Sequence, residues 1–154
     1  MAWKSTYSYD VYLSFRAEDT GMGLASHLYA VLSQKGIRTF FNKELNKGDE
    51  HWAAISKAIE ESRIAIILLS LNYAFSSFCL EELATILDRQ EEKKLKFVIP
   101  VFHKVEPSNV RKQTGSYGEA FARHELIFKD DKEKLNRWRM ALHRVGSISG
   151  FDSG

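Results

Sequence analysis

The sequence predicts an α/β domain of the flavodoxin-like class, a five-stranded parallel sheet in the order 2-1-3-4-5 with helices on both faces. Two observations lead to this prediction. Short runs of strand-forming residues alternate with helical stripes along the chain. One run, residues 64–69, is apolar without a break, which is typical of a strand buried on both faces of a parallel sheet. Because parallel crossovers are right-handed, few strand orders remain.

The pattern also places the individual elements. Further strands are expected at residues 10–15, 37–41 and 96–102, and helical stripes at residues 24–32, 52–62, 78–90, 121–128 and 135–145. Gly36 is placed to end the first helix, and Pro107 to open a short one. A short fifth strand is expected near the turn-rich residues 105–121, where the pattern alone does not locate it.

Length and composition indicate one domain, residues 1–154, with a core from about residue 9 to 151. The net charge of +2 is too small to indicate binding to nucleic acid or to an anionic membrane. The one cysteine, Cys79, excludes an internal disulfide, and the amino terminus lacks the apolar core of a signal peptide. We therefore expect a soluble domain of the cytoplasm or the nucleus, with neither nucleic acid nor membrane as partner.

The expected ligand crevice lies between the carboxyl ends of the first and third strands. The first strand ends in Phe15 and Arg16, and the third in Ser70. Phe78 and Glu82 lie four residues apart on the next helix, so they share one face near its start. Glu82 is thus a candidate for chemistry. Its alternative interpretation is an acidic residue that compensates the helix dipole or faces solvent.

Three other patterns have structural interpretations. Gly21 and Gly23 suit the start of a dinucleotide fingerprint, but Ser26 replaces its third glycine, so a loop and helix start is favoured. Cys79 has no flanking base, which favours a small apolar residue over a nucleophile. The histidines lack metal-ligand spacing, so no metal site is expected. They are His27, His51, His103, His124 and His143.

Several long motifs occur in one order along nearly the whole chain. They are YDVYLSFRAEDT, GIRTFFNKELNKGDE, AIEESRIAIILLSLNYAFSSFCLEEL, VIPVFHKVEPSNVRKQTGSYGEAF and RWRMAL. Together they resemble the TIR (Toll/interleukin-1 receptor) domain in its plant immune-receptor form. The resemblance implies a domain of a receptor of the TIR-NBS-LRR type, or of a related TIR-only or TIR-NBS protein.

The resemblance implies an NAD⁺ nucleosidase (NADase) that releases nicotinamide and forms ADP-ribose-type nucleotides, which trigger plant defence and cell death. The catalytic glutamate of the family motif corresponds to Glu82, not to Glu81. One carboxylate is enough, because nicotinamide leaves NAD⁺ or NADP⁺ as a neutral molecule and needs no acid. NAD⁺ is then a substrate, and no cofactor is expected. The substrate-binding residues implied are Arg16, Phe15, Ser70, Phe78, Cys79 and Lys47.

This chain departs from the family at the nucleotide site. Gly21 replaces an arginine, Phe78 a tryptophan, and Lys47 the arginine of the BB loop, the segment after the second strand. Because lysine does not grip phosphate bidentately as arginine does, these replacements predict weak turnover. The alternative is a non-catalytic module for TIR–TIR interaction with a degenerate NAD⁺ site.

Ser26 and His27 match a serine–histidine pair that forms a symmetric dimer contact in relatives. The resemblance therefore implies homotypic or heterotypic TIR domains as partners. A second interpretation is an ordinary polar pair on an exposed helix turn.

Overall fold

The computed structural model describes residues 7–21, 23–41 and 49–153. These residues form a parallel five-stranded sheet in the order β2-β1-β3-β4-β5, which confirms the predicted fold class. The strands are β1 (Tyr9–Ser14), β2 (Thr39–Phe40), β3 (Ser62–Leu69), β4 (Phe97–Phe102) and β5 (Phe151–Asp152). β3 is the central strand, and the apolar run that predicted it pairs with β1 on one side and β4 on the other.

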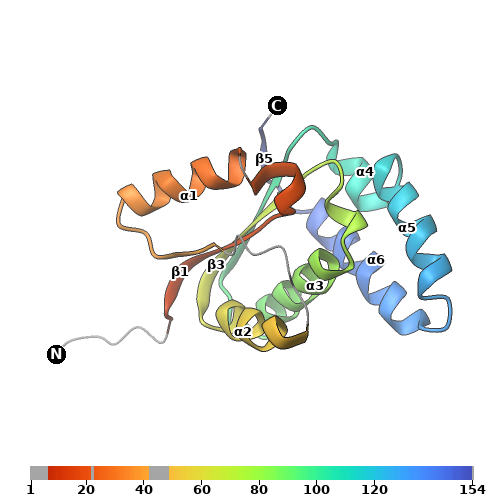
Figure 1. Cartoon of the computed structure of the whole chain (residues 1–154), viewed down its shortest axis with the longest axis horizontal. Helices are drawn as coiled ribbons and strands as arrows, with labels where there is room; N and C mark the ends of the chain where they lie inside the picture. Colours follow the sequence, from red (N-terminus) through yellow and green to blue (C-terminus); the bar gives the residue numbers. More distant parts are fainter. Residues whose placement is uncertain (1–6, 22, 42–48, 154) are drawn as a thin grey trace.

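Six α-helices surround the described part of this sheet (Figure 1). They are α1 (Leu24–Gln34), α2 (Asp49–Glu60), α3 (Ser77–Glu91), α4 (Pro107–Lys112), α5 (Ser116–Ile127) and α6 (Lys132–Gly146). Figure 1 shows α1 apart from the other helices, across the sheet from α2 and α3. Two short helical turns, η1 (Ala17–Gly21) and η2 (Tyr73–Phe75), follow the carboxyl ends of β1 and β3. None of the helices described is both long and apolar enough to cross a bilayer.

The alternation of side chains along β1 divides the core in two. Leu13 and Phe15 pack under α1 in a small cluster with Ala25 and Leu68. Tyr12 points to the other face, into the large core beneath α2, α3, α5 and α6. Because side chains alternate along a strand, Ser14 must lie on the same face as Tyr12. Two hydroxyl groups of β1 therefore point toward α3.

The start of α3 is fixed by a side-chain cap. Ser76 accepts a hydrogen bond from the backbone N–H of Cys79 at 3.1 Å, as an N-cap serine does. The predicted core-facing residues of α3 are confirmed as buried, and they are Leu83, Ile86 and Leu87. Glu82 lies among them and is only 3% exposed. The helix therefore presents a carboxylate to the core rather than to solvent.

The predicted position of the fifth strand is wrong. Residues 105–121 form α4 and the start of α5, and the strand is instead β5, which pairs with Val101 and Phe102 near the end of the chain. A β-carbon on Gly150 would lie 2.2 Å from the Pro100 carbonyl oxygen, so this close approach requires glycine. A two-residue strand held by such an approach has no hydrophobic alternation to reveal it.

Two other elements differ in extent from the prediction. The second strand, expected over residues 37–41, is limited to Thr39–Phe40. In α1 the fully buried residue is Ala25, while Leu24 and Leu28 pack against the small core and Val31 and Leu32 are half-buried. The predicted inward stripe of α1 is therefore only partly covered by the sheet.

Candidate functional site

Glu82 reaches from α3 to two hydroxyl groups of β1. The Ser14 Oγ donates to Oε1 of Glu82 at 2.5 Å, and the Tyr12 hydroxyl donates to Oε2. Burying an ionised carboxylate is costly unless hydrogen bonds replace its water. The two donors compensate part of that cost and give each carboxylate oxygen its own partner. The carboxylate is thus held at the carboxyl-terminal half of β1, where the sequence predicts the crevice.

A third hydroxyl group, that of Tyr73, contacts Ser14. The Tyr73 hydroxyl lies 2.8 Å from Ser14 Oγ and 3.2 Å from the Cys79 carbonyl oxygen. With the single hydroxyl hydrogen of Ser14 donated to Glu82, the single hydroxyl hydrogen of Tyr73 is shared between two acceptors, Ser14 Oγ and the Cys79 carbonyl oxygen. Burial raises the pKa of both Tyr12 and Tyr73 well above the ordinary tyrosine value, so both remain protonated donors.

Asp19 joins the loop after β1 to the loop after β3. Its Oδ2 accepts hydrogen bonds from Ser70 Oγ at 2.7 Å and from the Asn72 backbone N–H at 2.8 Å. Its Oδ1 accepts from Arg16 Nη1 at 3.3 Å. Burial alone would raise the pKa of Asp19, but these hydrogen bonds and the Arg16 charge hold it below its ordinary value. Asp19, which the sequence analysis did not identify as a site residue, therefore connects two predicted site residues, Arg16 and Ser70.

The Arg16 Nε pairs with Glu18 by charge but makes no hydrogen bond within the part of the chain that the structure describes. This Nε is buried, and the Glu18 carboxylate lies 4.0 Å away. A buried donor without a hydrogen bond is unusual in folded proteins. Since arginine side chains are common phosphate ligands, this Nε is suited to an anionic group of a ligand at the crevice.

The other predicted substrate-binding residues have different surroundings. Phe15 and Cys79 are buried, and the Cys79 thiol contacts the Phe15 carbonyl oxygen at 3.8 Å. Phe78 is half-buried and packs edge-on against Trp52, with ring centroids 5.5 Å apart. Lys47 lies outside the described residues. Of these residues, the described ones therefore comprise two buried residues and one half-buried aromatic ring.

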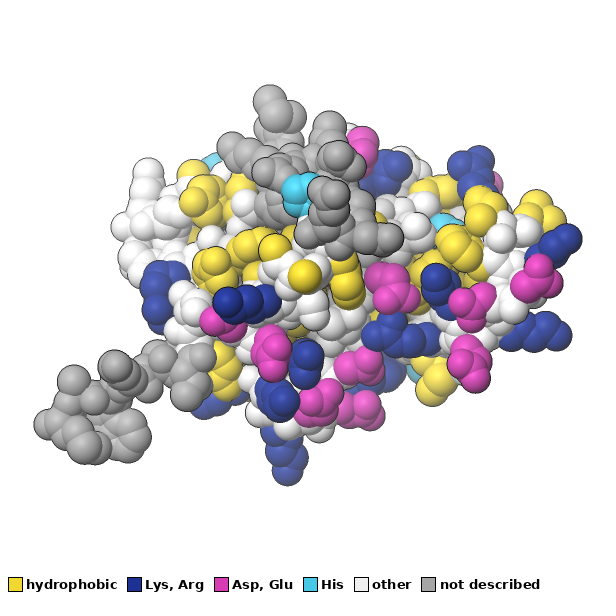
Figure 2. Space-filling model, turned by 60° about the horizontal axis from the view of Figure 1, so that its bottom comes forward, with side chains coloured by type: hydrophobic (Ala, Val, Ile, Leu, Met, Phe, Trp, Pro, Cys, Tyr) yellow, Lys and Arg dark blue, Asp and Glu magenta, His cyan; other side chains and the backbone are white. Residues whose placement is uncertain are grey.

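Glu81, the neighbour of Glu82, faces a different element. Its carboxylate accepts hydrogen bonds from Trp138 Nε1 at 2.8 Å and from Arg137 Nη1 at 3.0 Å, both on α6. Arg137 also pairs with Asp88 at 2.9 Å. Figure 2 shows the face on which α2, α3 and α6 lie, with basic and acidic side chains interspersed across it. Glu81 thus connects α3 to α6, while Glu82 points to the sheet.

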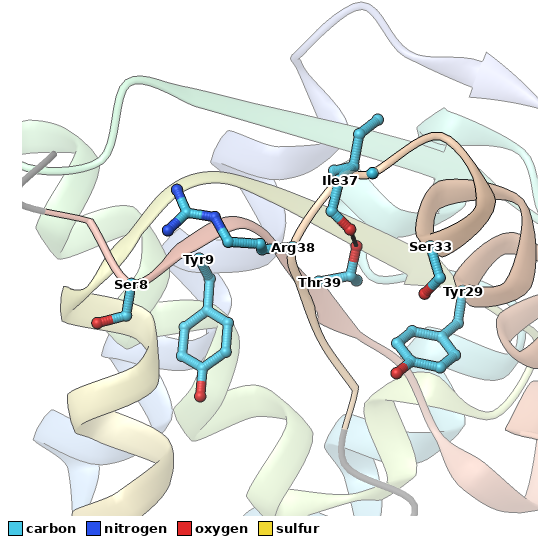
Figure 3. Close-up of a pocket in the computed structure, with 8 residues that line it drawn as sticks. Ser8, Tyr9, Tyr29, Ser33, Ile37, Arg38 and Thr39 are labelled. Atoms are coloured by element: carbon cyan, nitrogen blue, oxygen red, sulfur yellow. Dashed lines mark hydrogen bonds between the residues drawn. The ribbon is translucent and has the colours of Figure 1, made fainter.

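A shallow depression at the opposite edge of the sheet is less suited to chemistry (Figure 3). Its lining is Ser8, Tyr9, Tyr29, Ser33, Gly36, Ile37, Arg38 and Thr39. Arg38 is already paired with Asp10 at 3.1 Å, and the Thr39 hydroxyl donates to the Ile37 carbonyl oxygen. The depression lies at the amino ends of β1 and β2, whereas ligands of such sheets bind at the carboxyl ends.

The predicted self-association residues lie on α1. His27 is exposed and Ser26 is half-buried, while Ala25 beside them is fully buried against the sheet. His27 is therefore available to a partner domain. No contact that tests the predicted interface is present in a single chain, so this assignment stays a prediction.

We expect Asp19→Asn to destabilise the domain at neutral pH and to have a smaller effect in acid. The folded state lowers the pKa of Asp19, so its charge stabilises the fold above its ordinary pKa and ceases to do so as the pH falls through its folded value. Thermal unfolding of both proteins from pH 7 to pH 3 measures this difference. A gap between parent and variant that is the same at every pH would contradict the assignment.

Comparison with known proteins identifies the family. The family model of the TIR domain matches residues 8–154. The chain is 48% identical over 147 residues to the TMV resistance protein N of Nicotiana glutinosa, and 47% identical over 146 residues to the disease resistance protein RPV1 of Vitis rotundifolia. Each alignment covers 95% of this chain but only 13% and 10% of the relatives, so the chain spans about a tenth of their length.

Solved structures agree with this result. The TIR domains in the structure of the activated Roq1 resistosome directly recognizing the pathogen effector XopQ are 49% identical, with a TM-score of 0.85 over 95% of this chain and 88% of that chain. The heterodimer of the RPS4 and RRS1 TIR domains matches at 18% identity with a TM-score of 0.50, over 90% of this chain and 99% of that chain, which shows likeness of fold alone. The chain therefore belongs to the TIR domain family and is similar to the TIR domains of plant disease resistance proteins.

Proposed function

We propose that this TIR domain self-associates and hydrolyses NAD⁺ or NADP⁺ as a signalling step of plant innate immunity. The observation that carries the proposal is the Glu82 carboxylate, which is held by neutral hydroxyl donors at the carboxyl ends of the central strands. Its place in the chain corresponds to the glutamate of the family motif. A buried carboxylate near the carboxyl ends of parallel strands is typical of a functional site.

The proposed reaction breaks the bond between C1′ of the ribose and the nicotinamide nitrogen. Nicotinamide leaves with the bonding electron pair as a neutral molecule, and positive charge develops on the ribosyl group. Glu82 stabilises that charge, and its effect is large because the site is shielded from water. Water then attacks C1′ and loses a proton to solvent, which gives ADP-ribose from NAD⁺. The Arg16 Nε is the proposed donor to a phosphate oxygen of the substrate.

Substrate access to Glu82 requires a local rearrangement, because the side chain is only 3% exposed. We propose that association of domains provides it. The Roq1 TIR domains belong to a resistosome, and RPS4 and RRS1 form a TIR heterodimer. These assemblies belong to those proteins, and the Roq1 resistosome, at 49% identity, supports a similar requirement for contact between TIR domains here.

A non-catalytic interaction module is the second candidate. Asp19 already engages Ser70 and part of Arg16, and the family residues at Gly21 and Phe78 are replaced. Measurement of nicotinamide release from the purified domain over a series of protein concentrations separates the two functions. Turnover per molecule that rises with concentration supports an enzyme activated by association. If no nicotinamide is released at any protein concentration, the non-catalytic interaction module is the supported function.

We expect Ser26→Ala combined with His27→Ala to shift the domain toward monomer and to lower nicotinamide release at matched concentration. A two-fold contact places the same pair on both partners, so each substitution acts twice. Light scattering over a concentration series measures association, and Lys57→Ala on α2 is the control on the other face of the sheet. Association and turnover equal to the parent would show that α1 is not the interface.

A further inference from the structure

Tyr12 and Ser14 have a role that the sequence motifs do not assign. We propose that these two β1 hydroxyls are positioning residues, which hold the Glu82 carboxylate in one orientation for electrostatic stabilisation of the ribosyl cation. This inference rests on the proposed NADase function. It extends the site from Glu82 on α3 to strand β1, whose residues lie about 70 positions earlier in the chain.

The geometry gives each donor a separate oxygen. Tyr12 and Ser14 are two residues apart on a strand, so they project from the same face of the sheet about 7 Å apart along it. Tyr12 donates to Oε2 of Glu82, and Ser14 donates to Oε1. A carboxylate held at both oxygens cannot rotate freely about its terminal bond. The Tyr12 ring is itself fixed by stacking on Phe40, with centroids 5.2 Å apart.

The donors orient the carboxylate without neutralising it. A lysine or arginine at either position would cancel the negative charge that stabilises the ribosyl cation. Hydroxyl groups favour the ionised form through hydrogen bonds but leave its charge in place. Burial and the adjacent Glu82 charge keep the Tyr12 hydroxyl protonated, since both raise its pKa. Neutral donors are therefore suited to a carboxylate that acts by electrostatic stabilisation.

The contribution of each hydroxyl should follow its distance from Glu82. Ser14 touches the carboxylate directly, whereas Tyr73 acts on it only through Ser14. Ser14→Ala is therefore expected to lower kcat more than Tyr73→Phe does. Ser14→Cys, which has a similar size and a weaker S–H donor, is expected to give an intermediate kcat.

The main experiment measures kcat and KM for nicotinamide release in Tyr12→Phe and Ser14→Ala. Each is expected to lower kcat by about tenfold or more, with KM within about twofold, because the lost hydrogen bond is made to a charged group. Tyr117→Phe and Ser62→Ala are the controls. These also remove buried hydroxyls, which donate to the backbone carbonyls of Ser70 and Ala58 rather than to Glu82.

A mutant cycle with Glu82→Gln separates positioning from a purely structural role. If Tyr12 acts through Glu82, Tyr12→Phe lowers turnover in the parent but not in the Glu82→Gln background. Equal losses in both backgrounds, or a kcat unchanged from the parent, would overturn the positioning role while leaving the NADase function standing. A parent domain that releases no nicotinamide at any concentration would overturn the proposed function, and this inference with it.

Discussion

Glu82→Gln is expected to lower nicotinamide release by about 10²-fold or more, because the charge that stabilises the ribosyl cation is removed. Glutamine has nearly the same shape and retains an acceptor for a β1 hydroxyl, so the fold should persist. The measurement is nicotinamide release under single-turnover and steady-state conditions, at protein concentrations where the parent is active. Circular dichroism and thermal unfolding of the same samples confirm that the variant is folded.

Glu81→Gln is the matched control for this experiment. Adjacent helix positions point about 100° apart, and the structure places Glu81 against Trp138 and Arg137 rather than against the sheet. Glutamine keeps an acceptor for the Trp138 N–H, so turnover should stay near that of the parent. Equal loss in both variants, or no loss in either, would contradict the assignment of catalysis to Glu82.

The sequence was informative about the order of elements because strand and helix periods differ. The unbroken apolar run of β3 and the helical stripe of α3 are local patterns, and both are confirmed. β5 could not be predicted in the same way. It depends on a close backbone contact between Gly150 and Pro100, and such contacts between distant residues leave no periodic signal.

The sequence assigns the candidate site residues to one edge of the sheet, but it does not predict the contacts among them. Parallel strands end at one edge of the sheet, so Arg16, Ser70 and Glu82 could be assigned to one region. The burial of Glu82 could not, because it depends on Tyr12 and Ser14, far earlier in the chain. The alternation of side chains along β1 does indicate a buried polar partner, because Tyr12 and Ser14 fall on the same face of the strand. Two hydroxyl residues on its inner face require polar partners, and a glutamate within the apolar stripe of α3 is such a partner.

The connection between α3 and α6 is also absent from the pattern. RWRMAL supports the family resemblance, but nothing local indicates that the Trp138 indole N–H donates to Glu81. The same tryptophan packs against His124 and Phe128, with ring centroids 5.2 Å from each. One side chain therefore joins α3, α5 and α6. The orientation of α3, and with it the direction of Glu82, depends on this packing.

Trp138→Ala is therefore expected to be strongly destabilising. Trp138 is 1% exposed, and truncating a buried tryptophan to alanine lowers the free energy of unfolding by about 3–5 kcal/mol. For a domain of this size, each kcal/mol corresponds to a loss of about 2–4 °C in Tm. Thermal unfolding measures the shift. Met140→Ala is the control, since Met140 lies on the same helix and is 57% exposed.

The contribution of the indole N–H can be isolated in the same assay. Trp138→Phe keeps most of the ring packing but leaves Glu81 without one of its donors, so it should cost less than Trp138→Ala. Combining Trp138→Phe with Glu81→Ala should cost less than the sum of the two single changes, because each single change already removes the Trp138–Glu81 hydrogen bond. Strict additivity would show that the bond between α3 and α6 contributes nothing to stability. A Trp138→Ala variant with the Tm of the parent would show that this packing does not hold α3 in place.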